Sequence, residues 1–266
     1  MNRHLTRGAA VAVSAALLLA GCGNTEDQDE GVAPQESAAP PVTDTEWFTE
    51  KFTSAPVFVG AATENAQTYR PDNNQGEPLP EDAPEGSILW QAPACIPTPF
   101  TSDGPTESVL DSKGVLQLSG YEQTELGAAA AGIGLLAVSS ASADQDLATS
   151  IATGLPLLEA QRLVATSPVF GSQAARVRAP GEPCRNIDHR PTAYRVADMT
   201  DSYAVVDFFS PVSNSPGEGV TIRLSVEWTG ADWRLSPSSF DSLANSYEQY
   251  DPQQTRTVDL AEFTQW

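Results

Sequence analysis

Apolar and polar residues alternate with a period of two through the C-terminal part of the chain. The alternation predicts strands over residues 193–199, 203–209 and 220–228, and Trp233 begins a further strand after a turn at 229–232. Because short turns join these strands, we expect an antiparallel meander with one buried and one solvated face.

A helical pattern precedes the strands. Thr124 is a good N-cap, Glu125 complements the helix dipole, and residues 126–138 are apolar and mostly small. Gly132 and Gly134 each lower helix propensity by about 1 kcal/mol. We therefore expect this helix to approach a flat partner closely, such as a sheet.

Two further helices are expected before the strands. One starts at Ser142, with Gln145 completing a capping box, and ends at Gly154. The other has Pro156 as its first residue and ends before the Ser167-Pro168 pair. Helices followed by a meander predict an α+β domain over residues 88–266, with N-terminal helices packed on one face of a curved antiparallel sheet.

The preceding segments are poor in core-forming residues. Residues 22–45 are acidic and rich in Pro and Ala, which predicts a disordered tether. Residues 46–87 are expected to form a loop-rich extension with a short strand at 57–59. The apolar patch around Trp47 and Phe48 is interpreted as a short helix that docks on the domain, or as a partner-binding segment.

The chain begins with the pattern of a bacterial lipoprotein signal over residues 1–21. A basic start with Arg3 and Arg7 leads into an apolar run and then Leu19-Ala20-Gly21-Cys22. Cys22 would receive the lipid and become the first mature residue. The run is shorter than the roughly 20 residues of a membrane span, although an uncleaved anchor stays open as an alternative. The expected location is the cell membrane, lipid-anchored, on the extracytoplasmic side.

The net charge narrows the range of partners. The formal charge is -21, and cleavage before Cys22 would remove Arg3 and Arg7 but no acid. Such a chain lacks the clustered cations that grip nucleic acid, so no nucleic-acid partner is expected. Anionic lipids would repel it, so the lipid on Cys22 must provide the membrane contact. An alternative explanation of the negative charge is that it only keeps an exported protein soluble.

The remaining two cysteines are Cys95 and Cys184. An exported protein occupies a compartment that permits disulfides, so we expect these two residues to pair. The alternative is two buried free thiols.

The sequence holds little recognisable catalytic chemistry. His189 is the only histidine after the signal, and a lone histidine between Asp188 and Arg190 is more often inert than a base or a ligand. No nucleophile–histidine triad, zinc spacing or phosphate-binding glycine loop is present. We therefore expect no catalytic residues, no metal ligands and no cofactor.

Asp207 raises the possibility of a polar site on the sheet. By alternation it shares a face with Tyr203, and Asp198 could converge on the same cavity. If instead Ala204, Val206 and Phe208 point inward, Asp207 lies on the outer side. The tryptophans of the hairpin could line the cavity or form a core pair. The candidate cavity-binding residues are Asp198, Tyr203, Asp207, Trp228 and Trp233.

Several short motifs resemble a known group of proteins. The matching stretches are Gly104-Pro105, residues 124–130, the hairpin at 228–235 and the terminal residues 263–266. The element order with this hairpin looks like the cone-shaped fold of nuclear transport factor 2-like proteins. More specifically, residues 95–266 resemble a poorly characterised actinobacterial domain of lipoproteins and membrane proteins that is often linked to conjugative elements. The aromatic-histidine pair usual before the helix is replaced here by Glu122-Gln123.

We expect, from the signal and the resemblance together, a lipid-anchored, non-catalytic binding or assembly module of the cell envelope. The resemblance implies an envelope protein partner in a conjugation-type transfer apparatus. One alternative is a lipoprotein that binds a small apolar molecule in the cone cavity. Another is a cavity enzyme with Asp207 or Asp198 as its general base.

Overall fold

The computed structural model describes residues 46–49, 56–59, 88–167, 170, 190–211, 217–248 and 256–266. These residues all belong to one unit of the chain, residues 41–266. The signal at 1–21, the tether at 22–45, Cys184 and His189 lie outside the described residues.

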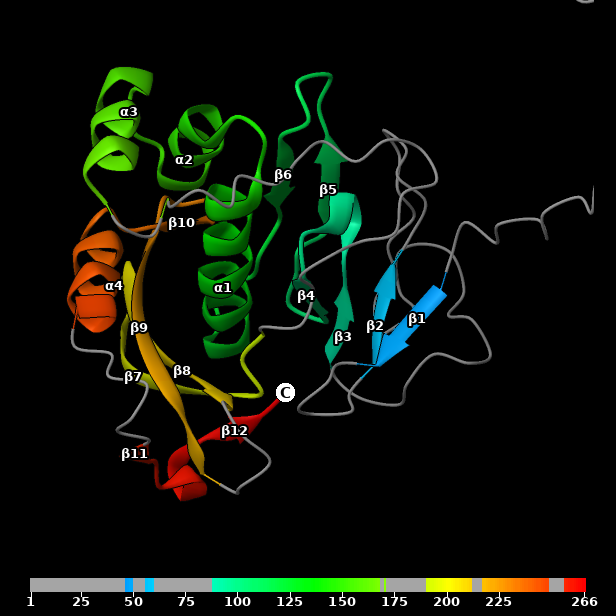
Figure 1. The fold of residues 1–266 in the computed structure, drawn as a ribbon, viewed down its shortest axis with the longest axis vertical. Helices are drawn as coiled ribbons and strands as arrows, with labels where there is room; N and C mark the ends of the chain where they lie inside the picture. Colours follow the sequence, from blue (N-terminus) through cyan, green and yellow to red (C-terminus); the bar gives the residue numbers. More distant parts are fainter. Residues whose placement is uncertain are drawn as a thin grey trace, which may run out of the picture. The chain divides into compact units, whose positions relative to one another are not determined.

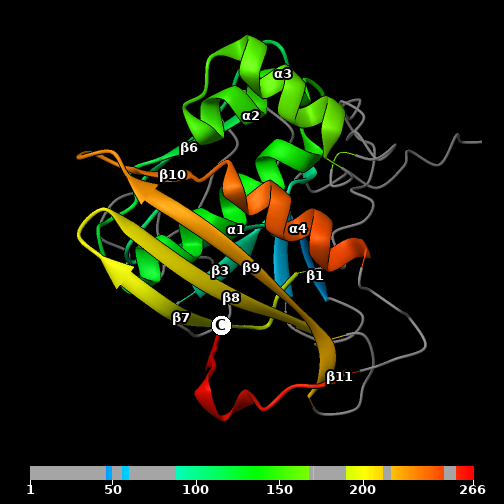
Figure 2. The ribbon, with the colours of Figure 1, turned by 90° about the vertical axis from the view of Figure 1, so that its left-hand side faces the viewer.

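The large sheet is antiparallel and contains the predicted meander. Its strands follow the order β10-β9-β8-β7-β12, and β11 pairs with another part of β9. Figures 1 and 2 show the long strands β7, β8 and β9 side by side. The bounds are β7 Ala193–Thr200, β8 Tyr203–Pro211, β9 Glu218–Trp228, β10 Trp233–Leu235, β11 Arg256–Thr257 and β12 Thr264–Gln265.

Two smaller sheets come before the first helix. The N-terminal sheet has the order β1-β2-β3-β4, in which β2 and β3 are parallel and the other pairs are antiparallel. A separate hairpin joins β5 and β6. The bounds are β1 Glu46–Thr49, β2 Pro56–Val59, β3 Ile88–Gln91, β4 Thr98–Thr101, β5 Glu107–Leu110 and β6 Leu116–Ser119. The helix interpretation around Trp47 is therefore wrong, because that segment pairs with β2 as a strand.

Helix α1 (Glu125–Ala141) is buried along most of its length. It begins as predicted, with the Thr124 hydroxyl accepting a hydrogen bond from the amide of Gly127 at 3.0 Å. A helix that is apolar all round must be covered all round. Strands of the large sheet cover one side, and β4 and β6 contact another (Figure 1).

The two interior glycines of α1 face different layers. A Cβ atom on Gly132 would lie 3.5 Å from the side chains of Phe208 and Val226 in the large sheet. A Cβ atom on Gly134 would lie 2.9 Å from the Tyr121 hydroxyl and 3.4 Å from Leu118. The small residues therefore let β layers approach the helix from two sides. The sequence predicted close approach to one sheet, and the structure shows a second layer as well.

The other helices are α2 (Gln145–Thr153), α3 (Leu157–Thr166) and α4 (Ser238–Glu248). The predicted start of α2 at Ser142 is corrected, because Asp144 is the N-cap and its carboxylate accepts from the amide of Leu147 at 3.0 Å. Ser142 instead ends α1. The α3 helix ends at Thr166 as expected, whereas α4 was not predicted.

The large sheet has two different faces. The inner face carries Ala204, Val206 and Phe208, which are fully buried in the core with α1. The opposite side, called the outer face below, is turned toward the viewer in Figure 2 with α1 behind it. The protein is thus α+β with antiparallel sheets, as predicted. Among the helices that the structure describes, none has both the length and the apolar character needed to span a membrane.

The packing of α1 predicts opposite effects for two glycine-to-alanine substitutions. In Gly127→Ala the new Cβ would lie 2.2 Å from the backbone oxygen of Glu122, so we expect a loss of about 2 kcal/mol in the free energy of unfolding. In Gly132→Ala the Cβ makes ordinary contacts, so better helix propensity should contribute up to about 1 kcal/mol. Urea unfolding of both variants checks this, and equal effects would contradict the described packing.

Candidate functional site

The five predicted cavity residues lie on both faces of the large sheet. The strand register puts Asp198 and Tyr203 on the outer face with Asp207, since Asp198 is opposite Val205 and Tyr203 is opposite Glu227. The remaining two, Trp228 and Trp233, are on the inner face. The five candidates therefore do not meet in one cavity, because the sheet separates the two tryptophans from the other three residues.

The two tryptophans form a core pair. Trp228 and Trp233 are directly opposite each other on β9 and β10, with ring centroids 5.3 Å apart in an edge-on arrangement. Trp233 is fully buried and donates from Nε1 to the backbone oxygen of Glu122 at 2.8 Å. The alternative that they pack in the core is the one that the structure favours.

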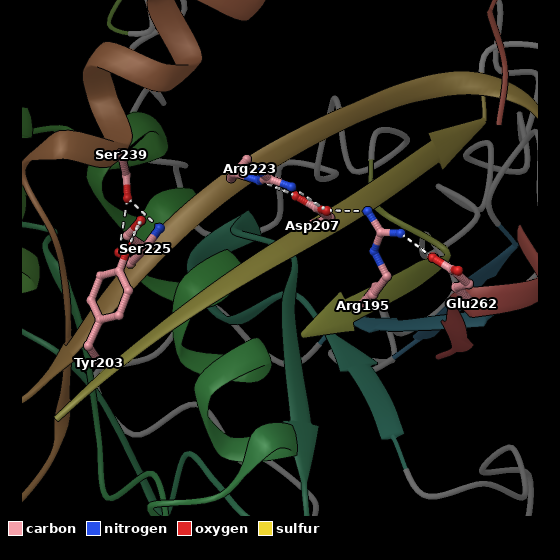
Figure 3. A network of polar contacts seen from close by, with 7 residues as sticks. All are labelled: Arg195, Tyr203, Asp207, Arg223, Ser225, Ser239 and Glu262. Carbon is pink, nitrogen blue, oxygen red and sulfur yellow. Dashed lines mark hydrogen bonds and ion pairs between the residues drawn. The ribbon is translucent and has the colours of Figure 1, made fainter. Parts of the chain in front are cut away.

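Asp207 is the centre of a row of charged side chains on the outer face. Arg195 on β7 and Arg223 on β9 are its direct cross-strand neighbours. Arg223 donates from Nε at 2.6 Å and from Nη2 at 2.9 Å, and Arg195 donates from Nη2 at 2.7 Å. Figure 3 shows both guanidinium groups pointing toward the carboxylate between them. The Asp207 side chain is only 3% exposed, although it lies on the outer face.

These contacts fix the charge of Asp207. Burial raises the pKa of a carboxyl group, but hydrogen bonds from Arg223 and Arg195 outweigh burial and hold the pKa of Asp207 below its usual value. The same bonds raise the pKa of both arginines. A general base at neutral pH needs a pKa near that pH and an accessible oxygen. Asp207 has neither, so its role in this arrangement is to hold two guanidinium groups.

Arg195 connects this row to the last part of the chain. Its Nη1 donates to Glu262 at 2.5 Å, and its guanidinium lies 5.1 Å from the centre of the Phe263 ring. The Glu262 side chain is 72% exposed, against 34% for Arg195 and 56% for Arg223. The guanidinium groups are therefore partly accessible to solvent, whereas the carboxylate that orients them is not.

A second polar group attaches α4 beside β9. The hydroxyl of Ser239 accepts from the backbone amide of Ser225 at 2.8 Å and donates to the Ser225 carbonyl at 2.9 Å. The Tyr203 hydroxyl lies 3.3 Å from the Ser225 hydroxyl (Figure 3). Because Ser239 satisfies the backbone groups of β9 next to the short strand β10, this side of the sheet is protected by a helix.

Only one of the two cysteines of the expected disulfide, Cys95, is among the described residues. Cys95 is disulfide-bonded and belongs to the short 3-10 helix η1 (Pro93–Cys95). Its expected partner Cys184 lies outside the described residues, so this pairing stays a prediction. In the part of the chain that the structure describes, no three His, Cys, Asp or Glu residues come together in a way that could hold a metal ion.

The comparison with protein families gives one clear result. The family described as a domain of unknown function, DUF8175, matches residues 53–265. The chain belongs to the DUF8175 family. No curated protein and no solved structure matches the chain. The DUF8175 match includes β2 and every element after it, and therefore includes the whole Asp207 row.

The sequence pattern points to the acid at the centre of this row but does not identify the residues around it. Arg195 and Arg223 lie in the predicted strands. The alternation within each strand indicates on which face of the sheet each arginine lies, but not which residues of other strands are its neighbours. Knowledge of the register between strands was needed to place them opposite Asp207. Glu262 comes from a segment for which the pattern predicted no position on the sheet, so only the structure could supply it.

The Asp207 contacts predict a pH-dependent loss of stability in Asp207→Asn. Removing the charge weakens the hydrogen bonds of two partly exposed arginines, so we expect about 2 kcal/mol lower free energy of unfolding at pH 7. A carboxyl whose folded pKa is lowered stabilises above its unfolded pKa, and this contribution is lost as the pH falls through the folded value. The difference in free energy of unfolding between the variant and the wild type should therefore be largest above about pH 4 and should become smaller at lower pH.

The matched control for this prediction is Asp198→Asn on the same face. Asp198 is exposed, so its loss should change stability by less than about 0.5 kcal/mol. Chemical unfolding at several pH values measures both variants. A gap for Asp207→Asn that stays constant from pH 7 down to the acid limit would contradict the assigned role.

Proposed function

We propose that this DUF8175 protein is a lipid-anchored lipoprotein on the extracytoplasmic side of the cell membrane, where its folded part binds a partner protein without catalysing a reaction. The Leu19-Ala20-Gly21-Cys22 sequence after a basic and apolar start supports the anchor. The 23 residues from Gly23 to Thr45 would allow the domain to reach a partner some distance from the bilayer.

The observation that carries the binding function is the arrangement of the outer face. A buried carboxylate holds two partly exposed guanidinium groups in fixed positions on three adjacent strands. Arginine is frequent in protein–protein interfaces, where its planar group forms several directed hydrogen bonds. Because Asp207 orients these groups before any partner arrives, little side-chain entropy would be lost on binding.

The same geometry supports a binding role over catalysis. Asp207 accepts three hydrogen bonds from arginines and its side chain is only 3% exposed, so it is poorly placed to remove a proton from a substrate. Asp198, the other candidate base, is exposed near the end of β7. A base in an enzyme needs a site that surrounds the substrate, and an exposed residue on an edge strand gives no such enclosure.

Small-molecule binding in a cone cavity is the alternative, and side-chain packing supports it less well. The inner face of the large sheet carries Trp233, Phe208 and Tyr194, all of which are buried in the same core as α1. A cavity filled by aromatic side chains favours a module that binds through its surface. The cone-shaped fold similar to nuclear transport factor 2, and a place in a conjugation-type transfer apparatus of actinobacteria, are parts of this proposal that rest on the resemblance.

The lipid anchor is tested by Cys22→Ala. The variant has no thiol to accept the lipid, so we expect loss of lipid incorporation and an unprocessed or released chain. Metabolic labelling with a fatty acid, together with membrane fractionation, measures both effects. A cleaved, unlipidated chain that stays on the membrane like the wild type would contradict the lipoprotein part of the proposal.

The binding face is tested by photo-crosslinking in intact cells. A photoreactive residue replaces Thr221, the outer-face neighbour of Arg223 two positions away on β9. We expect a discrete crosslinked partner protein from this position. The matched control replaces Val109, which is 51% exposed on the β5–β6 hairpin. Crosslinks from Val109 and none from Thr221 would contradict the assignment of the outer face.

A further inference from the structure

The segment 257–266 lies against the large sheet at two separate places. It follows directly from β11 beside β9 and continues to β12 beside β7, as the red ribbon in Figure 2 shows. Between these strands, η3 (Leu260–Glu262) turns the chain. The β12 strand pairs with only Ala193 and Tyr194, and both of its side chains are exposed. Two further backbone hydrogen bonds hold the segment, from the amide of Val258 to Gly217 at 2.8 Å and from the amide of Trp266 to Thr192 at 3.0 Å. Backbone pairing is therefore confined to the two ends of the segment.

The segment forms an ion pair with the large sheet, and this ion pair is exposed to solvent. Glu262 is 72% exposed where it accepts from Arg195, and exposed ion pairs contribute little to stability. Phe263 follows it, with its ring 6.5 Å from that of Phe209 and beneath the Arg195 guanidinium. Two consecutive residues, the acidic Glu262 and the aromatic Phe263, thus both contact Arg195.

Trp266 makes the main apolar contact of the segment. Its ring centroid lies 4.7 Å from Tyr194, 5.7 Å from Trp90 and 6.2 Å from Phe208. The three aromatic residues come from β3, β7 and β8, all outside the segment, and are called the aromatic receptor below. The Nε1 atom of Trp266 is buried and has no hydrogen-bond partner among the described residues. An unpaired buried donor makes this fit less favourable than the ring contacts alone suggest.

We propose that the segment 257–266 is an internal ligand, and that a segment of the partner protein with the same chemistry replaces it. The partner segment carries an aromatic residue for the place beneath Arg195 and a tryptophan three positions after it for the aromatic receptor. Because it stays extended, its acidic residue for Arg195 stands two positions before the aromatic residue, on the same face of the sheet. This inference rests on the proposed binding function and names the kind of partner. It is a form of strand addition, in which main-chain pairing with an exposed edge is combined with pockets for alternate side chains.

A partner segment can compete because it gains contacts that residues 257–266 do not make. The turn at η3 leads the chain away before Phe263, so in the described part of the chain β12 covers only the first two residues of β7. A partner strand that stays extended before its aromatic residue can pair further along β7, toward the bulge between Val196 and Asp198. The contacts shared by both segments cancel in the exchange, so this extra pairing determines which segment binds.

The proposal is tested with a fluorescent peptide of residues 258–266, titrated into the full mature chain. Wild-type protein should bind it weakly, because its own segment is present at high effective concentration. The double variant Glu262→Gln/Trp266→Ala weakens this internal competitor and should bind the peptide at least about tenfold more tightly. A peptide carrying the same two substitutions should lose that gain. Thermal unfolding of each protein shows that the binding proteins are folded.

The matched control protein is Leu158→Ala/Glu159→Gln, which also removes one exposed apolar and one exposed acidic side chain but on α3. It should bind the peptide as weakly as the wild type. If the folded double variant gains no affinity, residues 257–266 are a permanent part of the core and the proposal is overturned. A dimer of the wild type that the peptide cannot dissociate would assign the site to a second copy and also overturn it. Either result leaves the crosslinking test at Thr221 unaffected.

Discussion

The close packing of α1 between β layers is the constraint on which the rest of the structure depends. The helix can be covered on several sides only because its residues are small: Gly132 faces Phe208 and Val226, while Gly134 faces Tyr121 and Leu118. One consequence is that much of the inner face of the large sheet packs in the core with α1. The arginines available for recognition lie on the outer face, where α1 does not reach, whereas Tyr194 and Phe208 on the inner face contact Trp266.

The outer face combines a buried acid with exposed bases. Asp207 would be costly to bury alone, and the two arginines that neutralise it are held in place by it. The acid thus acts as a positioning residue for two guanidinium groups that solvent can reach. The same row holds Glu262 through Arg195, so residues 257–266 attach where we propose that a partner binds. One set of contacts then stabilises the sheet and defines its binding surface.

Much of the fold follows from local sequence signals. The period of two predicted β7 to β10 almost to the residue, and Thr124 with its following small residues predicted α1. The strand at Trp47 was missed because its partner β2 is needed to make an extended conformation favourable. For the site, alternation gave Asp207 two possible faces, and only contact with α1 decides between them. The roles of Arg195, Arg223 and Glu262 depend on register and on a distant segment, which no local pattern encodes.

The most direct test of the account is hydroxyl-radical footprinting, with the protein on intact cells compared with the purified protein. If a partner binds the outer face and displaces residues 257–266, Tyr203 on that face becomes protected on cells, and Phe263 beside Arg195 becomes more strongly labelled. Leu157 and Leu158 on α3, which are 47% and 61% exposed, are labelled equally in both states. Equal labelling of Tyr203 and Phe263 in both states, with protection confined to α3, would contradict the outer face as the binding surface.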